Sequence, residues 1–406
     1  MPATATRGLK TVFVAIGALL VTTGGVRAGG PTEQSYPGQN IETFAFKSKV
    51  TGADQVIWIY TPPGYKDTST AYPVLYLTDS RHHFDHTVTT SRFLSQRQPA
   101  PKAMVVGLLS QDRFRDLTPT PDLTLDKRYR NSGGAGRFLK FLADEVIPHV
   151  DRSYRTTGFR MLAGHSLGGL FALHALMTRP DLFDAYILSD PSIWWERNAY
   201  TEKIRAFFKN TPGLSVSVYA SQSGPINKNF TTFETILRSY RSDLFRFATR
   251  RFPDETHISV PLMSYYSGLK ALFGGWRMPL LRNMTLVDDP IPRIKRYHQN
   301  LSQQFKTKVR PSEWNVNHYG YAYLKQGHAE TALAVMQYNH TLYPQSANVH
   351  DSLGEVYEAL GRFQEAHAHY RRAHALARKA AHRMLPLFEE NLRRIKKRLK
   401  GDRGGH

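Results

Sequence analysis

Residues 161–176 read MLAGHSLGGLFALHAL, and the interpretation of the whole chain depends on this stretch. An apolar run ends in Gly-His-Ser-Leu-Gly and passes into an alanine- and leucine-rich segment, which predicts a strand over 159–163 and a helix over 167–177. A serine at a sharp strand-to-helix turn is the setting of a catalytic nucleophile, but a glycine-rich connection in any α/β domain looks similar. The pattern G-x-S-x-G is too common to decide between the two without the surrounding sequence.

Strands and helices alternate on both sides of this turn. Three short strands separated by turns are expected first, and the uninterrupted apolar run that follows is typical of a buried central strand. Further β-α alternation predicts a mostly parallel sheet with helices on both faces, which is the α/β class. The expected strands are 41–50, 55–61, 72–78, 103–109, 159–163, 185–188, 214–220 and one within 244–252, and the expected helices are 138–150, 167–177, 200–209, 231–240 and 260–273.

From Pro292 onward the sequence offers only helix candidates, and it contains an internal repeat. Identical residues recur 34 positions apart, with a glycine at the turn and an alanine five residues later, which resembles the tetratricopeptide repeat. Because two such units bury little apolar surface alone, we expect supporting helices at 294–305 and 384–399. The sequence thus predicts a small all-α domain over 313–406, after a linker and leading helix at 277–312. The repeated pairs are Gly320 and Gly354, Tyr323 and Tyr357, Gly327 and Gly361, and Ala332 and Ala366.

The composition restricts the chemistry and suggests the partners. The 406 residues contain 54 lysines and arginines against 33 aspartates and glutamates and no cysteine. A thiolate metal site, a disulfide and a cysteine nucleophile are therefore excluded, and no metal or nucleotide motif is present, so no cofactor is expected. The net charge of +21 favours acidic partners. Eight basic residues between 383 and 403 indicate either a solvated helix end or a contact with an anionic envelope surface.

The N-terminus predicts export. Arg7 and Lys10 precede an apolar core of about a dozen residues at 11–22, which is shorter than the roughly 20 residues that span a bilayer. Val26-Arg27-Ala28 offers a small-x-small cleavage site. We therefore expect a signal peptide over 1–28 and a periplasmic or secreted protein, to which nucleic acid would seldom be available.

A serine nucleophile needs a general base, and His257 is the candidate. In α/β-hydrolases the chain order is Ser, acid, His, with the histidine after the last strand. His257 lies in FPDETHISVP at 252–261, between the last expected strand and the last helix of this domain. An ordinary surface histidine is the alternative. His165 is expected to be packed away from the serine.

Residues 72–276 resemble the esterase D-like family of α/β-hydrolases, and the likeness rests on several segments in order. They are YPVLYLTDS at 72–80, RFRDLTP at 113–119, FLADEVIPHVDRSYRT at 141–156, RMLAGHSLGGLFAL at 160–173, SDPSIWW at 189–195 and the run from 252 to 276. The resemblance implies an α/β-hydrolase fold over 29–276, with Ser166 as nucleophile and His257 as base. It also implies an oxyanion hole made by the backbone N–H groups of Leu167 and Arg81. Arg81 follows Asp79-Ser80, where the family usually has Asp-Gly.

The acid of the site has several candidates. Family members often place a carboxylate after the strand expected at 214–220, but the loop SQSGPINKN that follows here contains none. Asp190 is favoured, with Glu234 and Asp254 as the next choices, and a Ser–His dyad is the remaining alternative. The acid would orient the imidazole and stabilise the imidazolium, so its absence would slow the enzyme without changing its reaction class.

The sequence therefore predicts a serine hydrolase that cleaves small-molecule or envelope-derived carboxylic esters through an acyl-enzyme. Arg113, Trp194 and Trp195 are candidate pocket residues. A structural salt bridge would explain Arg113 equally, and core packing is the commoner role of a tryptophan pair. Acyl transfer to a sugar or lipid hydroxyl would use the same residues. A third hypothesis is a weakly active scaffold that binds a protein partner through its repeats.

Overall fold

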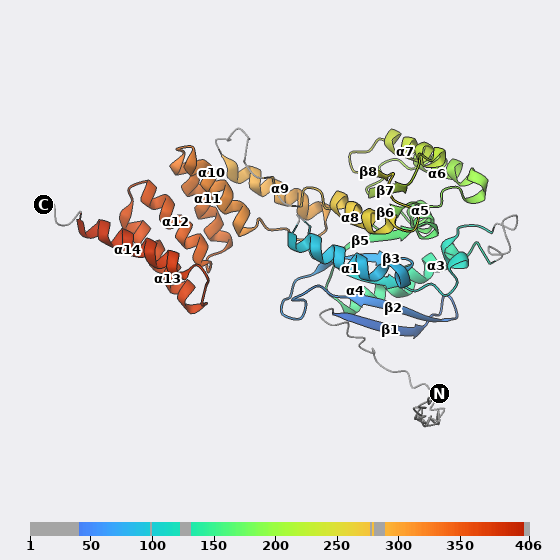
Figure 1. The fold of residues 1–406 in the computed structure, drawn as a ribbon, viewed down its shortest axis with the longest axis horizontal. Coiled ribbons are helices and arrows are strands. Elements are labelled where there is room, and N and C mark those ends of the chain that lie inside the picture. The colour runs from blue at the N-terminus through green and yellow to red at the C-terminus, as the bar shows by residue number, and fades with distance from the viewer. Residues whose placement is uncertain (1–39, 98–99, 122–130, 277, 280–288, 402–406) are drawn as a thin grey trace, which may run out of the picture.

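The computed structural model describes residues 40–97, 100–121, 131–276, 278–279 and 289–401. The expected signal peptide at 1–28 lies outside these residues. An α/β domain is followed by a helical region, and α9 (Pro290–Gln304) runs between them (Figure 1). Within the described ranges, no helix has the length and hydrophobicity needed to cross a membrane.

One eight-stranded sheet forms the centre of the first domain, in the order β1-β2-β4-β3-β5-β6-β7-β8. The pairs β1–β2 and β2–β4 are antiparallel, and every pair from β4 to β8 is parallel. All residues of β3, β4 and β6 are buried, as their apolar runs predict. The bounds are β1 Ile41–Lys47, β2 Asp54–Tyr60, β3 Tyr72–Leu77, β4 Met104–Leu108, β5 Thr156–His165, β6 Ala185–Ser189, β7 Ser217–Ser223 and β8 Arg246–Phe252.

Helices cover both faces of the sheet and create two cores. Along β3, Leu75 belongs to the core under α1 and α8, and Tyr76 belongs to the core on the other face, under α3 to α7. This alternation is the period of two that a strand imposes. The helices are α1 Ser80–Arg97, α2 Arg113–Leu117, α3 Ala135–Phe141, α4 Ile147–Ser153, α5 Leu167–Thr178, α6 Ala199–Asn210, α7 Lys228–Ser239 and α8 Val260–Leu272.

The sequence reasoning missed α1 and the short α2, and it misjudged one other helix. The α1 sequence SRHHFDHTVTTSRFLSQR is rich in polar and β-branched residues, so its buried Phe84, Val88 and Leu94 gave too weak a helical pattern. The single helix expected over 138–150 is divided into α3 and α4 by a π-helical turn at Leu142–Val146.

The helical region consists of paired antiparallel helices: α10 Glu313–Lys325, α11 Ala329–Leu342, α12 Ala347–Ala359, α13 Phe363–Lys379 and α14 Leu385–Gly401. Of the repeated glycines, Gly320 and Gly354 lie where paired helices touch, whereas Gly327 and Gly361 lie in the turns between helices, where their φ angles are positive. A Cβ on Gly320 would lie 2.6 Å from Met336 Cε, and one on Gly354 would lie 2.5 Å from Tyr370 Cε1. The helical region also contacts the first domain. Phe305, which follows α9, packs against Phe159 of β5, with the two ring centroids 5.1 Å apart.

Candidate active site

Ser166 occupies a strained turn between β5 and α5. Its φ of 58° and ψ of −116° are unfavourable for a residue with a side chain, and its N–H donates to Ser189 O at 3.0 Å. A Cβ on Gly164 would lie 2.2 Å from the Gly168 carbonyl oxygen, and one on Gly168 would lie 2.2 Å from Thr78 Oγ1. The two glycines are therefore required by close packing around the turn that presents the serine.

His257 and Asp190 meet at the carboxyl edge of the sheet. His257 Nδ1 lies 2.8 Å from Asp190 Oδ2, and the same oxygen accepts a hydrogen bond from Ser223 Oγ. Burial alone would raise the pKa of Asp190, but the hydrogen bonds from His257 and Ser223 outweigh it and hold the pKa of this carboxyl below its usual value. An imidazole that donates Nδ1–H to this carboxylate keeps the Nε2 lone pair for another proton.

The other two candidate acids lie elsewhere. Glu234, on α7, pairs with Arg238 at 2.8 Å and with Arg251 at 3.0 Å. Asp254 is exposed in the turn after β8. Of the three candidate carboxylates, Asp190 is the one that forms a hydrogen bond with His257.

The two expected oxyanion donors each lie in the first turn of a helix. Leu167 is the first residue of α5 and Arg81 the second of α1, so neither N–H has an acceptor within its own helix. Ser80 fits its position without strain, because the positive φ of 53° falls on Asp79 and the Ser80 hydroxyl donates to Leu77 O at 2.8 Å. The substitution of the family's usual glycine therefore leaves this turn intact.

A cavity of about 540 Å³ opens above Ser166 and His257. Arg113 lines it and forms two hydrogen bonds with Asp79, at 2.7 and 3.0 Å, while also donating to His165 O at 3.3 Å. Neither Trp194 nor Trp195, the two candidate pocket residues, is among its lining residues, and core packing, the alternative, applies to Trp195. Trp195 is fully buried in the core, where it donates to Thr120 Oγ1 at 3.0 Å. The lining residues are Asp79, His82, His83, His86, Arg113, His165, Ser166, His257, Ile258, Ser259, Pro261 and Leu262.

Imidazoles form one wall of this cavity. The ring centroids of His165 and His257 are 4.4 Å apart, His83 lies 5.3 Å from His165, and His86 lies 5.2 Å from His83. Burial, followed by the neighbouring histidines and Arg113, lowers the pKa of His165 to about 4 and that of His83 to about 3. His165, expected to point away, thus faces the cavity as a neutral ring. The described residues contain no cluster of three or more such side chains arranged to hold a metal ion.

Sequence reasoning overlooked the polar residues that surround the reacting groups. Ser192 Oγ lies 3.2 Å from Ser166 Oγ, and Ser223 supports Asp190 from the neighbouring strand. The histidines of α1 at positions 82, 83 and 86 fall at i, i+1 and i+4, a helical spacing that could have indicated a common face had α1 been recognised. Serines carry no comparable signal, because they are frequent in every loop.

Comparisons with known proteins agree with this architecture. A family described as "Putative esterase" matches residues 48–233, and the tetratricopeptide repeat family matches residues 347–380. Among solved structures, an IroE-like serine hydrolase from Shewanella oneidensis is 27% identical with a TM-score of 0.64, and the match covers 75% of this chain and all of that one.

Two curated relatives are esterases. Ferri-bacillibactin esterase BesA of Bacillus subtilis is 29% identical over 58% of this chain and 90% of its own length. A siderophore triacetylfusarinine C esterase of Aspergillus fumigatus is 32% identical over 46% of this chain and 69% of its own length.

Proposed function

Since the chain belongs to the esterase family and is a carboxylic-ester hydrolase, we propose that Ser166, His257 and Asp190 form its catalytic triad and that siderophore-type esters are its substrates. The observation that carries this proposal is the 2.8 Å contact between His257 and Asp190, in a cavity that both His257 and Ser166 line. The substrate class rests on the curated relatives, which act on ferri-bacillibactin and triacetylfusarinine C by name.

In this mechanism Ser166 Oγ attacks the ester carbonyl carbon while His257 Nε2 takes the hydroxyl proton. The carbonyl oxygen becomes an oxyanion that the N–H groups of Leu167 and Arg81 stabilise, helped by the positive ends of α5 and α1. The tetrahedral intermediate collapses as His257 returns the proton to the leaving alkoxide. Water then attacks the acyl-serine by the same steps and releases the acid. Asp190 keeps the imidazole in the required tautomer throughout.

The depressed pKa of His165 fits this mechanism. When His257 becomes an imidazolium, a second charged ring 4.4 Å away would oppose it. Because burial keeps His165 neutral near pH 7, the positive charge on His257 forms without that repulsion. The guanidinium of Arg113, which also lines the cavity, is paired with Asp79.

Labelling with a fluorophosphonate probe tests the nucleophile, with Ser192→Ala as the matched control. Ser192 is 2% exposed and its hydroxyl lies beside the Ser166 hydroxyl, so both variants remove one serine oxygen from the same place. We expect Ser166→Ala to abolish labelling and Ser192→Ala to retain it. Equal labelling of wild type and Ser166→Ala would refute the assignment.

Substrate class and acceptor are tested separately. Ferri-bacillibactin, triacetylfusarinine C and p-nitrophenyl acetate are incubated with the enzyme, and products are identified by mass spectrometry. We expect the two siderophores to be hydrolysed with a higher kcat/KM than the aryl ester. Added alcohols distinguish hydrolysis from acyl transfer, because a transferase would form new esters in preference to free acid.

A further inference from the structure

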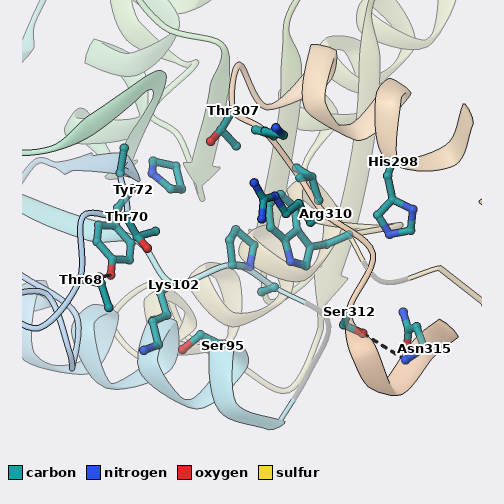
Figure 2. A pocket seen from close by; sticks show the side chains of 17 residues that line it. Thr68, Thr70, Tyr72, Ser95, Lys102, His298, Thr307, Arg310, Ser312 and Asn315 are labelled. Atoms are coloured by element: carbon teal, nitrogen blue, oxygen red, sulfur yellow. Dashed lines mark hydrogen bonds between the residues drawn. The ribbon is translucent and has the colours of Figure 1, made fainter. Parts of the chain in front are cut away.

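A second cavity, of about 490 Å³, lies between the α/β domain and the helical region (Figure 2). Tyr72 and Pro73, at the start of β3, and Lys102, just before β4, form one side. The loop from Thr307 to Ser312, between α9 and α10, forms the other. Because β3, β4 and β5 are parallel, this cavity lies at the opposite edge of the sheet from Ser166, which follows the end of β5. It is therefore separate from the candidate active site.

The charge around this cavity is of one sign. Lys102, Lys308 and Arg310 line it, and none of its described lining residues is acidic. Neither Lys308 nor Arg310 forms an ion pair with a carboxylate of the described residues, and Lys102 Nζ donates to the backbone oxygen of Pro63 at 2.8 Å. Three cations around one hollow repel one another unless an anion joins them.

Apart from these cations, the lining consists of polar, aromatic and aliphatic side chains. Asn315 is 4% exposed, and its Oδ1 has no hydrogen-bond partner among the described residues, although such buried atoms are normally paired. Trp276 and Tyr72 add aromatic surface, and burial lowers the pKa of His298, which leaves this ring neutral near pH 7. Hydroxyl groups complete the lining, from Thr68, Thr70, Ser95, Thr307 and Ser312.

We propose that this inter-domain cavity binds a small polyhydroxylated anion of the sugar-phosphate class. Arg310 and Lys308 are exposed at its rim and suit a phosphate group, because guanidinium and ammonium donors form strong charge-assisted hydrogen bonds with phosphate oxygens. The threonine and serine hydroxyls and Asn315 suit sugar hydroxyls, and Trp276 suits the apolar face of a sugar ring. The cavity volume lies within the range of small-molecule sites.

Such a ligand would also join the two parts of the molecule. It would contact the β3 side of the α/β domain and the α9–α10 loop together, so its binding would stabilise their packing against each other. We therefore expect a higher Tm for the full-length chain in its presence.

Calorimetric titration of the full-length chain tests the proposal with three probes: glucose 6-phosphate, glucose and inorganic phosphate. We expect glucose 6-phosphate to bind more tightly than either of the others and to raise Tm. The double variant Lys308→Ala/Arg310→Ala should weaken its binding by about tenfold or more. Arg371→Ala/Lys379→Ala is the matched control, since it removes two exposed cations from α13, away from the cavity, and should bind like wild type.

Each other outcome overturns the proposal. Absence of glucose 6-phosphate binding excludes the site, and equal weakening in both double variants indicates only general attraction to a basic protein. Inorganic phosphate that binds as tightly as the sugar phosphate excludes the polyhydroxyl part. The Ser166→Ala variant should bind glucose 6-phosphate normally, so loss of ester hydrolysis leaves this result unaffected. An unchanged kcat/KM for ester hydrolysis shows that the Lys308→Ala/Arg310→Ala variant is folded.

Discussion

Replacement of Asp190 by asparagine isolates the contribution of its charge. The substitution keeps the size of the side chain, but it replaces a carboxylate whose Oδ2 accepts from both His257, at 2.8 Å, and Ser223. An amide can present its own N–H to the imidazole, which would favour the tautomer with the proton on Nε2. In that tautomer His257 cannot accept the proton of Ser166.

The hydrogen bond between His257 and Asp190 sets the expected loss of activity in Asp190→Asn. A hydrogen bond to a charged group contributes about 1.5–3 kcal/mol, which corresponds to roughly a 10- to 100-fold change in rate. The Asp190 side chain is only 17% exposed, so water cannot easily take over its hydrogen bond to His257. The His257 side chain is 48% exposed, so water partly stabilises its imidazolium and limits the loss of activity. We therefore expect kcat/KM to fall by about 10- to 100-fold and fluorophosphonate labelling to slow in parallel.

Hydrolysis of p-nitrophenyl acetate by Asp190→Asn, Glu234→Gln and Asp254→Asn provides the measurement. The two control carboxylates do not contact His257, so their variants should stay within about twofold of wild type. Circular dichroism confirms that each variant is folded. If Asp190→Asn were as active as the controls, the enzyme would work as a Ser–His dyad and the reasoning from the 2.8 Å contact would fail.

Four further predictions concern other parts of the chain. Gly164→Ala should reduce stability by more than about 3 kcal/mol in urea unfolding, because its Cβ would lie 2.2 Å from the Gly168 backbone; a normal midpoint would contradict this. Burial raises the pKa of Asp351 to about 7, so the folded state holds its proton more tightly than the unfolded chain, and the free energy of unfolding should fall as pH rises from about 4 to 7. Asp351→Asn should flatten that dependence, and an unchanged slope would assign it to other groups. N-terminal sequencing of protein recovered from the periplasm or medium should begin at Gly29 or Gly30, whereas an intact Met1 would refute cleavage. Binding to anionic vesicles should weaken when Arg393, Lys396, Lys397 and Lys400, all exposed on α14, are changed to glutamine, and it should weaken in high salt; salt-independent binding would exclude the electrostatic contact.

The parts of the fold that sequence predicted are those with strong local patterns. Apolar runs identified the buried strands, and the G-x-S-x-G turn placed β5 and α5 around Ser166. The 34-residue spacing identified the helical repeats because each unit needs one glycine where its paired helices touch and another in the turn between them. By contrast, α1 has a polar sequence whose helix is stabilised by tertiary packing, and no local pattern reveals that.

The sequence likewise predicts only those residues of the candidate site that a local pattern marks. Ser166 and His257 lie at positions that their loops mark in the sequence, but the acid and the pocket walls depend on contacts between distant segments. Trp195 illustrates the difference, since a tryptophan pair near the site suggested a pocket wall and the ring instead fills the core. The imidazoles of His83 and His165 come from two elements and lie 5.3 Å apart only after α1 packs over the edge of β5.

The position of Asp190, the proposed acid, follows from the geometry of parallel strands. Members of the esterase D-like family often carry a carboxylate after the strand that corresponds to β7. In this chain that strand ends in Ser223. Since β6 and β7 are parallel neighbours, with Ser189 opposite Ser221, a side chain just after β6 reaches the same edge of the sheet. Asp190, with a φ of 43°, uses this proximity to reach His257, and Ser223 contributes a hydrogen bond instead of a charge. The imidazole can therefore keep its place while the carboxylate comes from the adjacent strand, which explains why the loop after β7 can lack an acid in a chain that retains the Ser–His pair.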